Sequence, residues 1–161
     1  MLLNSNQVFK YLQNAQSESI QQVSVDLHLK SVKKIQGGLI FKNKRDILTY
    51  RNVPTTYLSG RNIWIIGEGT YSVTFEEDCS IPNDRTGMIL HRSSLVRIGG
   101  NLDCGIFDPG YNSKHGMGAV LTVGKDCTIE LERGCSIATF YMFENLPVEE
   151  ELLYKGIYQD K

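Results

Sequence analysis

The feature that most constrains the fold is a series of short β-type segments separated by turn residues. Between residues 23 and 30 the odd positions are apolar and the even positions are polar. This is the two-residue period of a strand with one buried face. Asp26, at an even position, is therefore expected to point away from the apolar side chains.

Seven further runs have the length of strands and are rich in β-branched or aromatic residues. They lie at residues 38–41, 62–66, 71–75, 87–90, 119–123, 128–131 and 137–141. Turn signals containing Gly, Pro, Asn or Asp separate many of them. Many short strands at this spacing predict an all-β sandwich or jelly roll.

The first twenty residues differ from the rest, because they carry one helical signal. Apolar residues recur at helical spacing, and a residue that can cap a helix precedes them. The apolar residues are Val8, Phe9, Leu12 and Ala15, and the candidate caps are Asn4 and Ser5. We expect a short N-terminal helix in a single domain over residues 1–161, since a chain of 161 residues that is 41% hydrophobic can bury a core of its own.

Charge and composition exclude several classes of partner. The formal net charge is −1, so no overall field favours nucleic acid or an acidic membrane, and neither is expected as a partner. The N-terminus turns polar at once and lacks a secretory or membrane-spanning stretch, which predicts a cytoplasmic protein. The four cysteines are far apart in the sequence and form no C-x-x-C pair, as expected of reduced thiols.

Residues 91–100 contain the first candidate site. Arg92 and Arg97 bracket Ser93 and Ser94, which supplies fork-shaped cationic donors and short neutral donors within a few residues. This combination suits the oxygens of a polyphosphate. The alternative is a helix entry at which one serine caps the helix and the arginines are solvated. The pattern alone does not separate the two interpretations.

Residues 102–111 contain the second candidate site. An apolar stretch ends at Asp108, directly before a Pro-Gly turn, and Tyr111 follows. A carboxylate held at such a turn could orient and deprotonate a water molecule, and the Tyr111 ring could lie against a sugar. Asp108 could also be only a turn residue, because Asp-Pro-Gly is favoured turn chemistry.

These segments together resemble the dUTPase/dCTP deaminase superfamily. Residues 92–99 are similar to its phosphate-binding R-S-S-L-x-R-x-G motif, and residues 107–111 to its hairpin motif with the active-site aspartate. The other similar segments, which follow the family's order, are residues 24–29, 71–89, 134–140 and 154–159. The resemblance covers residues 20–161, although residues 31–62 match no motif.

The resemblance implies a distorted jelly roll of the dUTPase-like β-clip type. It also implies a homotrimer whose active sites are assembled from neighbouring subunits. A C-terminal tail of about residues 147–161 is expected to pack over the active site. The substrate is expected to be deoxyuridine or deoxycytidine triphosphate.

Two reactions are open to such a site: hydrolysis of dUTP between its α- and β-phosphates, and loss of the 4-amino group from dCTP. Family deaminases carry a glutamate five residues after a glycine. Gly118 is the best match to that glycine, which puts Val123 where the glutamate should stand. Valine cannot carry a proton, so we predict a dUTP pyrophosphatase.

Two alternatives remain open. The first is a zinc-independent or bifunctional dCTP deaminase, and the second is a catalytically weak nucleotide-binding regulatory protein. Zinc-dependent deaminase chemistry is excluded, since neither H-x-E nor P-C-x-x-C occurs.

The resemblance also assigns roles to individual residues. Asp108 and Arg97 are the expected catalytic residues, and Asp26 is expected to help hold Mg²⁺ indirectly, through water or the triphosphate. Thr139 stands where the family usually has glutamine, which shortens the polar reach toward phosphate. The expected substrate-binding residues are Arg92, Ser93, Ser94, Gly105, Ile106, Phe107, Tyr111, Thr139, Tyr154 and Gln159.

Overall fold

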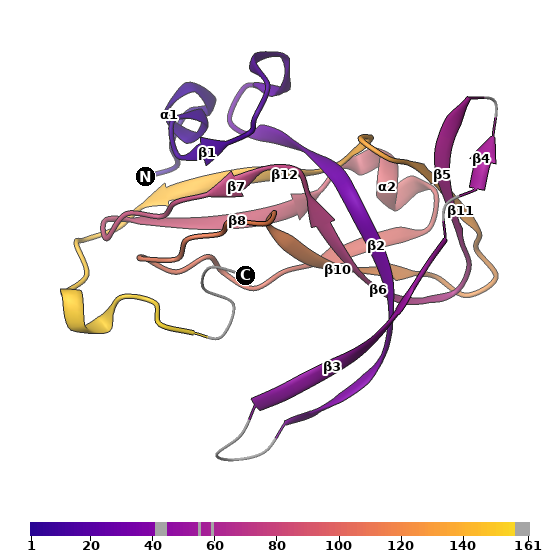
Figure 1. The fold of residues 1–161 in the computed structure, drawn as a ribbon. Coiled ribbons are helices and arrows are strands. Elements are labelled where there is room, and N and C mark those ends of the chain that lie inside the picture. The colour runs from indigo at the N-terminus through magenta and orange to yellow at the C-terminus, as the bar shows by residue number, and fades with distance from the viewer. Residues whose placement is uncertain (41–44, 55, 59, 157–161) are drawn as a thin grey trace.

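The computed structural model describes residues 1–40, 45–54, 56–58 and 60–156, and about half of these residues lie in strands, which pair in antiparallel fashion (Figure 1). The longer strands are β2 (Val25–Ile40), β3 (Arg45–Asn52), β5 (Arg61–Ile66), β6 (Gly69–Phe75), β8 (Arg85–His91), β10 (Gly118–Val123) and β12 (Ser136–Glu144). The shorter strands are β1 (Leu12–Gln13), β4 (Thr56–Leu58), β7 (Asp78–Cys79), β9 (Gly100–Asp103) and β11 (Ile129–Glu132). The predicted all-β class is confirmed.

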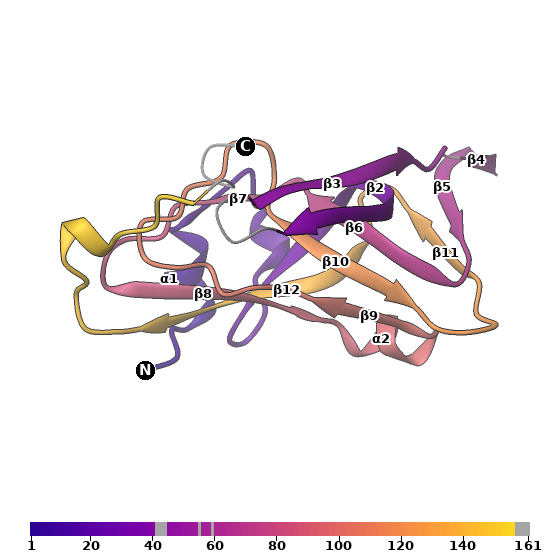
Figure 2. The same cartoon turned by 90° about the horizontal axis from the view of Figure 1, so that it is seen from below.

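The main sheet follows the order β8-β12-β2-β6-β10-β9, with β3 beside the far half of β2. Its two ends meet, because Phe107, just after β9, pairs with Gly87 of β8 through two backbone hydrogen bonds of 2.8 and 3.0 Å. A three-stranded sheet (β11-β5-β4) and a two-stranded one (β1-β7) complete the fold. The β2–β3 hairpin extends from the body (Figure 1), and Figure 2 shows β3, β2 and β6 side by side. Of the predicted strand at residues 38–41, the first three residues end β2, and Phe41 lies outside the described residues.

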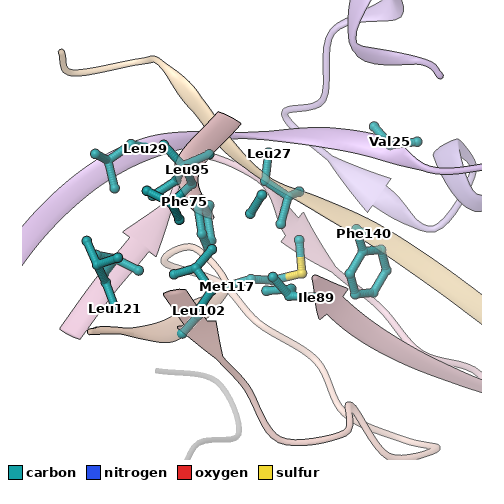
Figure 3. Close-up of a cluster of buried hydrophobic side chains, with 14 of the residues drawn as sticks. Val25, Leu27, Leu29, Phe75, Ile89, Leu95, Leu102, Met117, Leu121 and Phe140 are labelled. Carbon is teal, nitrogen blue, oxygen red and sulfur yellow. The ribbon is translucent and has the colours of Figure 1, made fainter. Parts of the chain in front are cut away.

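The core is built from the alternation seen in the sequence. Val25, Leu27 and Leu29 of β2 are fully buried, and they pack into the same cluster as Phe75 and Phe140 from neighbouring strands (Figure 3). The predicted alternation is therefore confirmed from Val25 to Leu29 and is wrong for Val23, which precedes the strand and is 43% exposed. The opposite face of β2 carries Asp26.

The N-terminal helix is shorter than its pattern predicts. Helix α1 spans Ser5–Phe9 and begins with a capping box, in which the Asn4 side chain accepts from the Gln7 backbone and the Gln7 side chain accepts from the Asn4 backbone. Leu12 is not helical, because β1 pairs with β7 instead. A tertiary contact thus overrides the local helical spacing. In the part of the chain that the structure describes, no helix is long and apolar enough to cross a membrane.

Candidate functional site

The Arg-Ser-Ser motif forms the start of a short helix at the end of β8. Helix α2 spans Ser93–Arg97, and Arg92 occupies the capping position without a capping bond from its side chain. Leu95 is only 1% exposed and anchors the helix in the core, whereas Ser93, Ser94 and Arg97 are exposed. The helix-entry alternative was therefore right about the helix and wrong about the cap. Both serines are therefore exposed in the first turn of α2, in the same helix as Arg97.

Arg92 is fixed by a charge pair with Asp26. The Arg92 guanidinium donates to Asp26 Oδ2 over 2.7 Å, and the Gln21 side chain donates to the same oxygen over 3.0 Å. The Arg92 backbone N–H donates to Ile137 O over 2.9 Å. Thr139 of β12 lies directly opposite Asp26 in the antiparallel register. The sequence-predicted residues Asp26, Arg92 and Thr139 therefore lie together at one end of the sheet.

Asp26 is buried, and its two oxygens have different surroundings. Burial raises the pKa of Asp26 above its ordinary value, and the charges of Arg92 and His28 and the Gln21 hydrogen bond oppose this increase. Asp26 Oδ1 is buried and has no hydrogen-bond partner among the described residues. An orphaned carboxylate oxygen fits a donor from outside the chain, such as a water bound to a metal ion. Within the described residues no group of three metal-ligating side chains exists. Asp26 therefore fits a role in which it contacts a metal ion through water and does not ligate it directly.

The Asp108 turn lies at the other end of β8. Gly105 and Ile106 are exposed, Ile106 at 64%, and Phe107 is buried. Asp108 is exposed at the tip. Backbone bonds hold this turn: Gly110 N–H donates to Ile81 O over 2.9 Å, and Tyr111 N–H donates to Asp108 O over 3.0 Å.

The described part of the tail lies against this turn. Tyr154 N–H donates to Pro109 O over 2.9 Å, and the Tyr154 ring contacts the edge of the Tyr111 ring at 5.3 Å between centroids. Burial raises the pKa of the Tyr111 hydroxyl well above its usual range. Gln159, the other tail residue predicted to bind substrate, lies outside the described residues.

Within one chain, the predicted residues thus form two groups and not one. The phosphate group contains Asp26, Thr139 and residues 92–97, and the hairpin group contains residues 105–111 and Tyr154. The hairpin attaches to β8 at Gly87, five residues before Arg92. Five residues of extended strand span roughly 17 Å. The two groups of one chain therefore lie at opposite ends of β8.

Comparison with known proteins identifies the family of this fold and site. The family described as dCTP deaminase-like matches residues 4–145, which is most of the chain. The chain belongs to the dCTP deaminase-like family. Its relatives include a protein of Methanosarcina mazei named "Probable deoxyuridine 5'-triphosphate nucleotidohydrolase", which is 31% identical over 99% of this chain and 97% of that protein. The deoxyuridine 5'-triphosphate nucleotidohydrolase of Methanocaldococcus jannaschii is 32% identical over 71% of this chain and 74% of that protein.

A solved member of the same structural class supports the fold. The 2'-deoxycytidine 5'-triphosphate deaminase of Agrobacterium tumefaciens superposes with a TM-score of 0.64 and 13% identity, over 88% of this chain and 47% of that one. This chain therefore matches about half the length of the solved deaminase. At that identity the likeness shows the fold alone.

Val123 is the residue that the sequence comparison above set against the deaminase glutamate, and it lies in the core. Val123 ends β10, is only 2% exposed and lies opposite Gly69 and Gly100 in the neighbouring strands. It is a core residue, and no acidic residue occurs between Tyr111 and Asp126.

Sequence reasoning missed two residues that bind polar side chains of β2. One is Gln21, which donates to Asp26. The other is Glu77, which is 1% exposed and accepts from both the backbone and the ring of His28, at 2.9 and 2.5 Å. Neither belongs to a motif or to a periodic pattern, so no signal in a single sequence marks them.

Proposed function

We propose that the protein hydrolyses dUTP to dUMP and pyrophosphate. The observation that carries the proposal is the match over nearly the whole chain to a relative named as a deoxyuridine triphosphate nucleotidohydrolase. The valine at position 123 and the lack of any acidic residue between Tyr111 and Asp126 support the same reaction over deamination, because deamination without zinc needs a carboxylate near the pyrimidine to move protons.

The phosphate group supplies the charge that a triphosphate needs. Ser93, Ser94 and Arg97 are exposed residues of α2, and Arg92, fixed by Asp26, directly precedes them in the chain. Phosphoryl transfer depends on positioning and on neutralising charge as it develops on the phosphoryl oxygens. Arg97 acts at the reacting phosphate, and Arg92 and the two serines bind the chain of phosphates. The short Thr139 side chain faces Asp26 and lines the same end of the sheet.

We assign the metal to the substrate side of this site. Mg²⁺, when bound to the triphosphate, neutralises phosphate charge and orients the phosphates for attack. Asp26 would hold the metal indirectly, because its orphaned Oδ1 could accept a hydrogen bond from water while Oδ2 stays paired with Arg92. A carboxylate that is paired with an arginine and buried is suited to this indirect role and poorly suited to direct ligation.

The hairpin group supplies the general base and binds the nucleoside. Asp108 is exposed on a turn fixed by backbone bonds, so its carboxylate can accept a proton from the water that attacks the α-phosphorus. Backbone groups of residues 105–107 bind the uracil, and the Tyr111 ring lies against the sugar, where a ribose 2'-hydroxyl would be crowded.

A complete site requires two copies of the chain, because one copy keeps its two groups at opposite ends of β8. We propose a homotrimer, in which the phosphate group of one subunit faces the hairpin group of the next. The outer face of the β8–β12 pair supports an interface, since it carries Leu90 and Phe143, which are exposed, and the partly buried Met88 and Tyr141. Apolar surface of this kind on a sheet favours burial by a partner.

Incubation with Mg²⁺ and either dUTP or dCTP tests the reaction. We expect pyrophosphate and dUMP from dUTP and no ammonia from dCTP. Ammonia from dCTP would instead support the deaminase or a bifunctional enzyme. Nucleotide binding without either product would support a regulatory protein that has kept the fold and lost turnover.

Mixing two impaired variants tests the shared site. We expect Arg92→Ala and Asp108→Asn each to have little turnover alone at a dUTP concentration near the wild-type KM, because the first binds dUTP weakly and the second lacks the base. Refolded together, they should recover roughly a quarter of wild-type turnover, because one site in four pairs an intact phosphate group with an intact hairpin group in a closed ring. Mixtures that stay inactive, although mass measurement shows mixed trimers, would contradict a site shared between subunits.

A further inference from the structure

A series of edge-on aromatic contacts connects the core to the C-terminal tail. The fully buried Phe140 lies 5.6 Å from Phe107, Phe107 lies 5.2 Å from Tyr111, and Tyr111 lies 5.3 Å from Tyr154, between ring centroids. The interplanar angles of 68–79° place each ring edge against the face of the next, which is a favoured aromatic geometry. Tyr111 therefore lies between a ring fixed by the core and a ring supplied by the tail.

The Tyr154 ring is itself confined by the tail and the turn. Its backbone donates to Pro109 O, and a Cβ at Gly110, whose φ is +88°, would lie 2.9 Å from the Leu153 side chain. On the other side, a Cβ at Gly156 would overlap the Tyr154 hydroxyl and ring. Only glycine lets the tail pass this close. The Tyr154 ring is thus packed against Gly156 on one side and contacts Tyr111 of the same chain.

We propose that Tyr154 is a positioning residue that sets the sugar specificity of the site by fixing the Tyr111 ring. The claim rests on the proposed function, in which Tyr111 lies against the sugar. Tyr154 acts through its ring. In a tail that only closes over the substrate, the Tyr154 hydroxyl would instead donate a hydrogen bond to the nucleotide.

The physical reason is that steric selection requires a rigid wall. A ring on a surface loop can move aside for one additional hydroxyl group at a small cost, because its side-chain rotamers remain accessible. The Tyr111 ring, which is packed between the rings of Phe107 and Tyr154, loses that freedom. The 2'-hydroxyl of a ribonucleotide then clashes with a Tyr111 ring that cannot move aside, whereas a deoxyribonucleotide has no such hydroxyl and fits.

The test compares kcat/KM for dUTP with kcat/KM for UTP in four variants. Tyr154→Ala should lower the dUTP/UTP ratio by roughly 2- to 10-fold, the value of one aromatic pair, mainly through a lower KM for UTP. Gly156→Ala should do the same with Tyr154 present, because the added methyl group displaces the ring. Tyr154→Phe keeps the ring and should keep the ratio. Lys155→Ala, an exposed neighbour in the same tail, is the matched control.

Two results would overturn the proposal: an unchanged ratio in Tyr154→Ala, or a loss in Tyr154→Phe as large as in Tyr154→Ala. The second result would mean that the hydroxyl binds the nucleotide directly. NMR of the nucleotide-free protein gives a readout apart from activity, since the Tyr111 ring protons should shift in Tyr154→Ala and not in Lys155→Ala. If the wild type does not hydrolyse dUTP, the proposed function fails. The ratio of dUTP to UTP dissociation constants in the same variants then decides the specificity claim.

Discussion

The phosphate group and the hairpin group are held in place by different physical means. On the phosphate side, a side-chain charge pair between Asp26 and Arg92 attaches the start of α2 to the sheet. On the hairpin side, backbone hydrogen bonds and ring contacts hold the turn around Asp108. The phosphate side therefore depends on the identity of charged residues, and the hairpin side depends on backbone geometry and aromatic packing.

This difference predicts different consequences of substitution at the two ends. A change to a charged residue on the phosphate side should affect both stability and substrate binding, because the same guanidinium serves both. A change to the exposed carboxylate on the hairpin side should affect chemistry alone, because no described side chain that holds the turn is paired with it. The predictions below test this contrast.

The largest effect is expected for Asp108→Asn. Asparagine keeps the shape of the side chain and cannot accept the proton of the attacking water, so kcat for dUTP should fall roughly 10²- to 10⁴-fold. The midpoint of urea unfolding and the dissociation constant for dUTP should stay close to wild type. Steady-state kinetics, urea unfolding and calorimetric titration measure the three quantities.

Asp103→Asn is the matched control, since Asp103 is an exposed carboxylate at the end of β9, in the same hairpin. It should keep kcat within a few-fold of wild type. Normal turnover in Asp108→Asn, or an equal loss in both variants, would remove Asp108 from its proposed role.

A smaller effect, this time on stability, is expected for Arg92→Ala. The substitution leaves Asp26 buried with only the Gln21 bond, and a buried acceptor that loses a partner costs about 1–3 kcal/mol. The lower part of this range is expected, because the Arg92 side chain is 39% exposed and its pair is partly screened by solvent. Urea unfolding measures the free-energy change, and dUTP binding should weaken in the same variant.

Arg97→Ala provides the comparison within the same motif. Arg97 is exposed, so its removal should change the free energy of unfolding by only about 0.5 kcal/mol or less while lowering turnover. If the two substitutions lower the free energy of unfolding equally, the ion pair between Arg92 and Asp26 adds no stability beyond what Arg97 contributes.

The two ends also differ in how far the sequence predicts them. The motif residues of the phosphate group could be named from the sequence because they lie within six consecutive residues. The alternation in β2 correctly turned Asp26 away from the core. The sequence did not predict that Asp26 would be buried on the opposite face and paired with Arg92, because that pairing depends on β12 lying between β2 and β8.

The turn around Asp108 was predicted from Asp-Pro-Gly, since those residues favour one local geometry. Its support was not predicted. The bonds from Gly110 to Ile81 and from Tyr154 to Pro109 join residues far apart in sequence through backbone atoms, which carry no residue-specific signal. The helical pattern that continued to Leu12 failed for the same reason, because a contact with β7 decided the local structure.

The smallest expected effect concerns the pH dependence of stability and tests which force dominates at Asp26. Burial raises the pKa of Asp26 above its ordinary value of 3.8, against the attraction of Arg92. The folded state then holds this proton more tightly than the unfolded state, so the Asp26 contribution makes folding less favourable as pH rises from 3.8 through the folded pKa. Asp26→Asn removes that contribution.

Over this interval, the free energy of unfolding of Asp26→Asn should therefore rise more, or fall less, with pH than that of wild type. Urea unfolding of both proteins at several pH values measures the difference, and Asp103→Asn provides the exposed-carboxylate control. A difference of the opposite sign would mean that the attraction of Arg92 outweighs burial. In that case the pair would stabilise the charged form, and the Oδ1 atom would need no donor from outside the chain to keep Asp26 ionised.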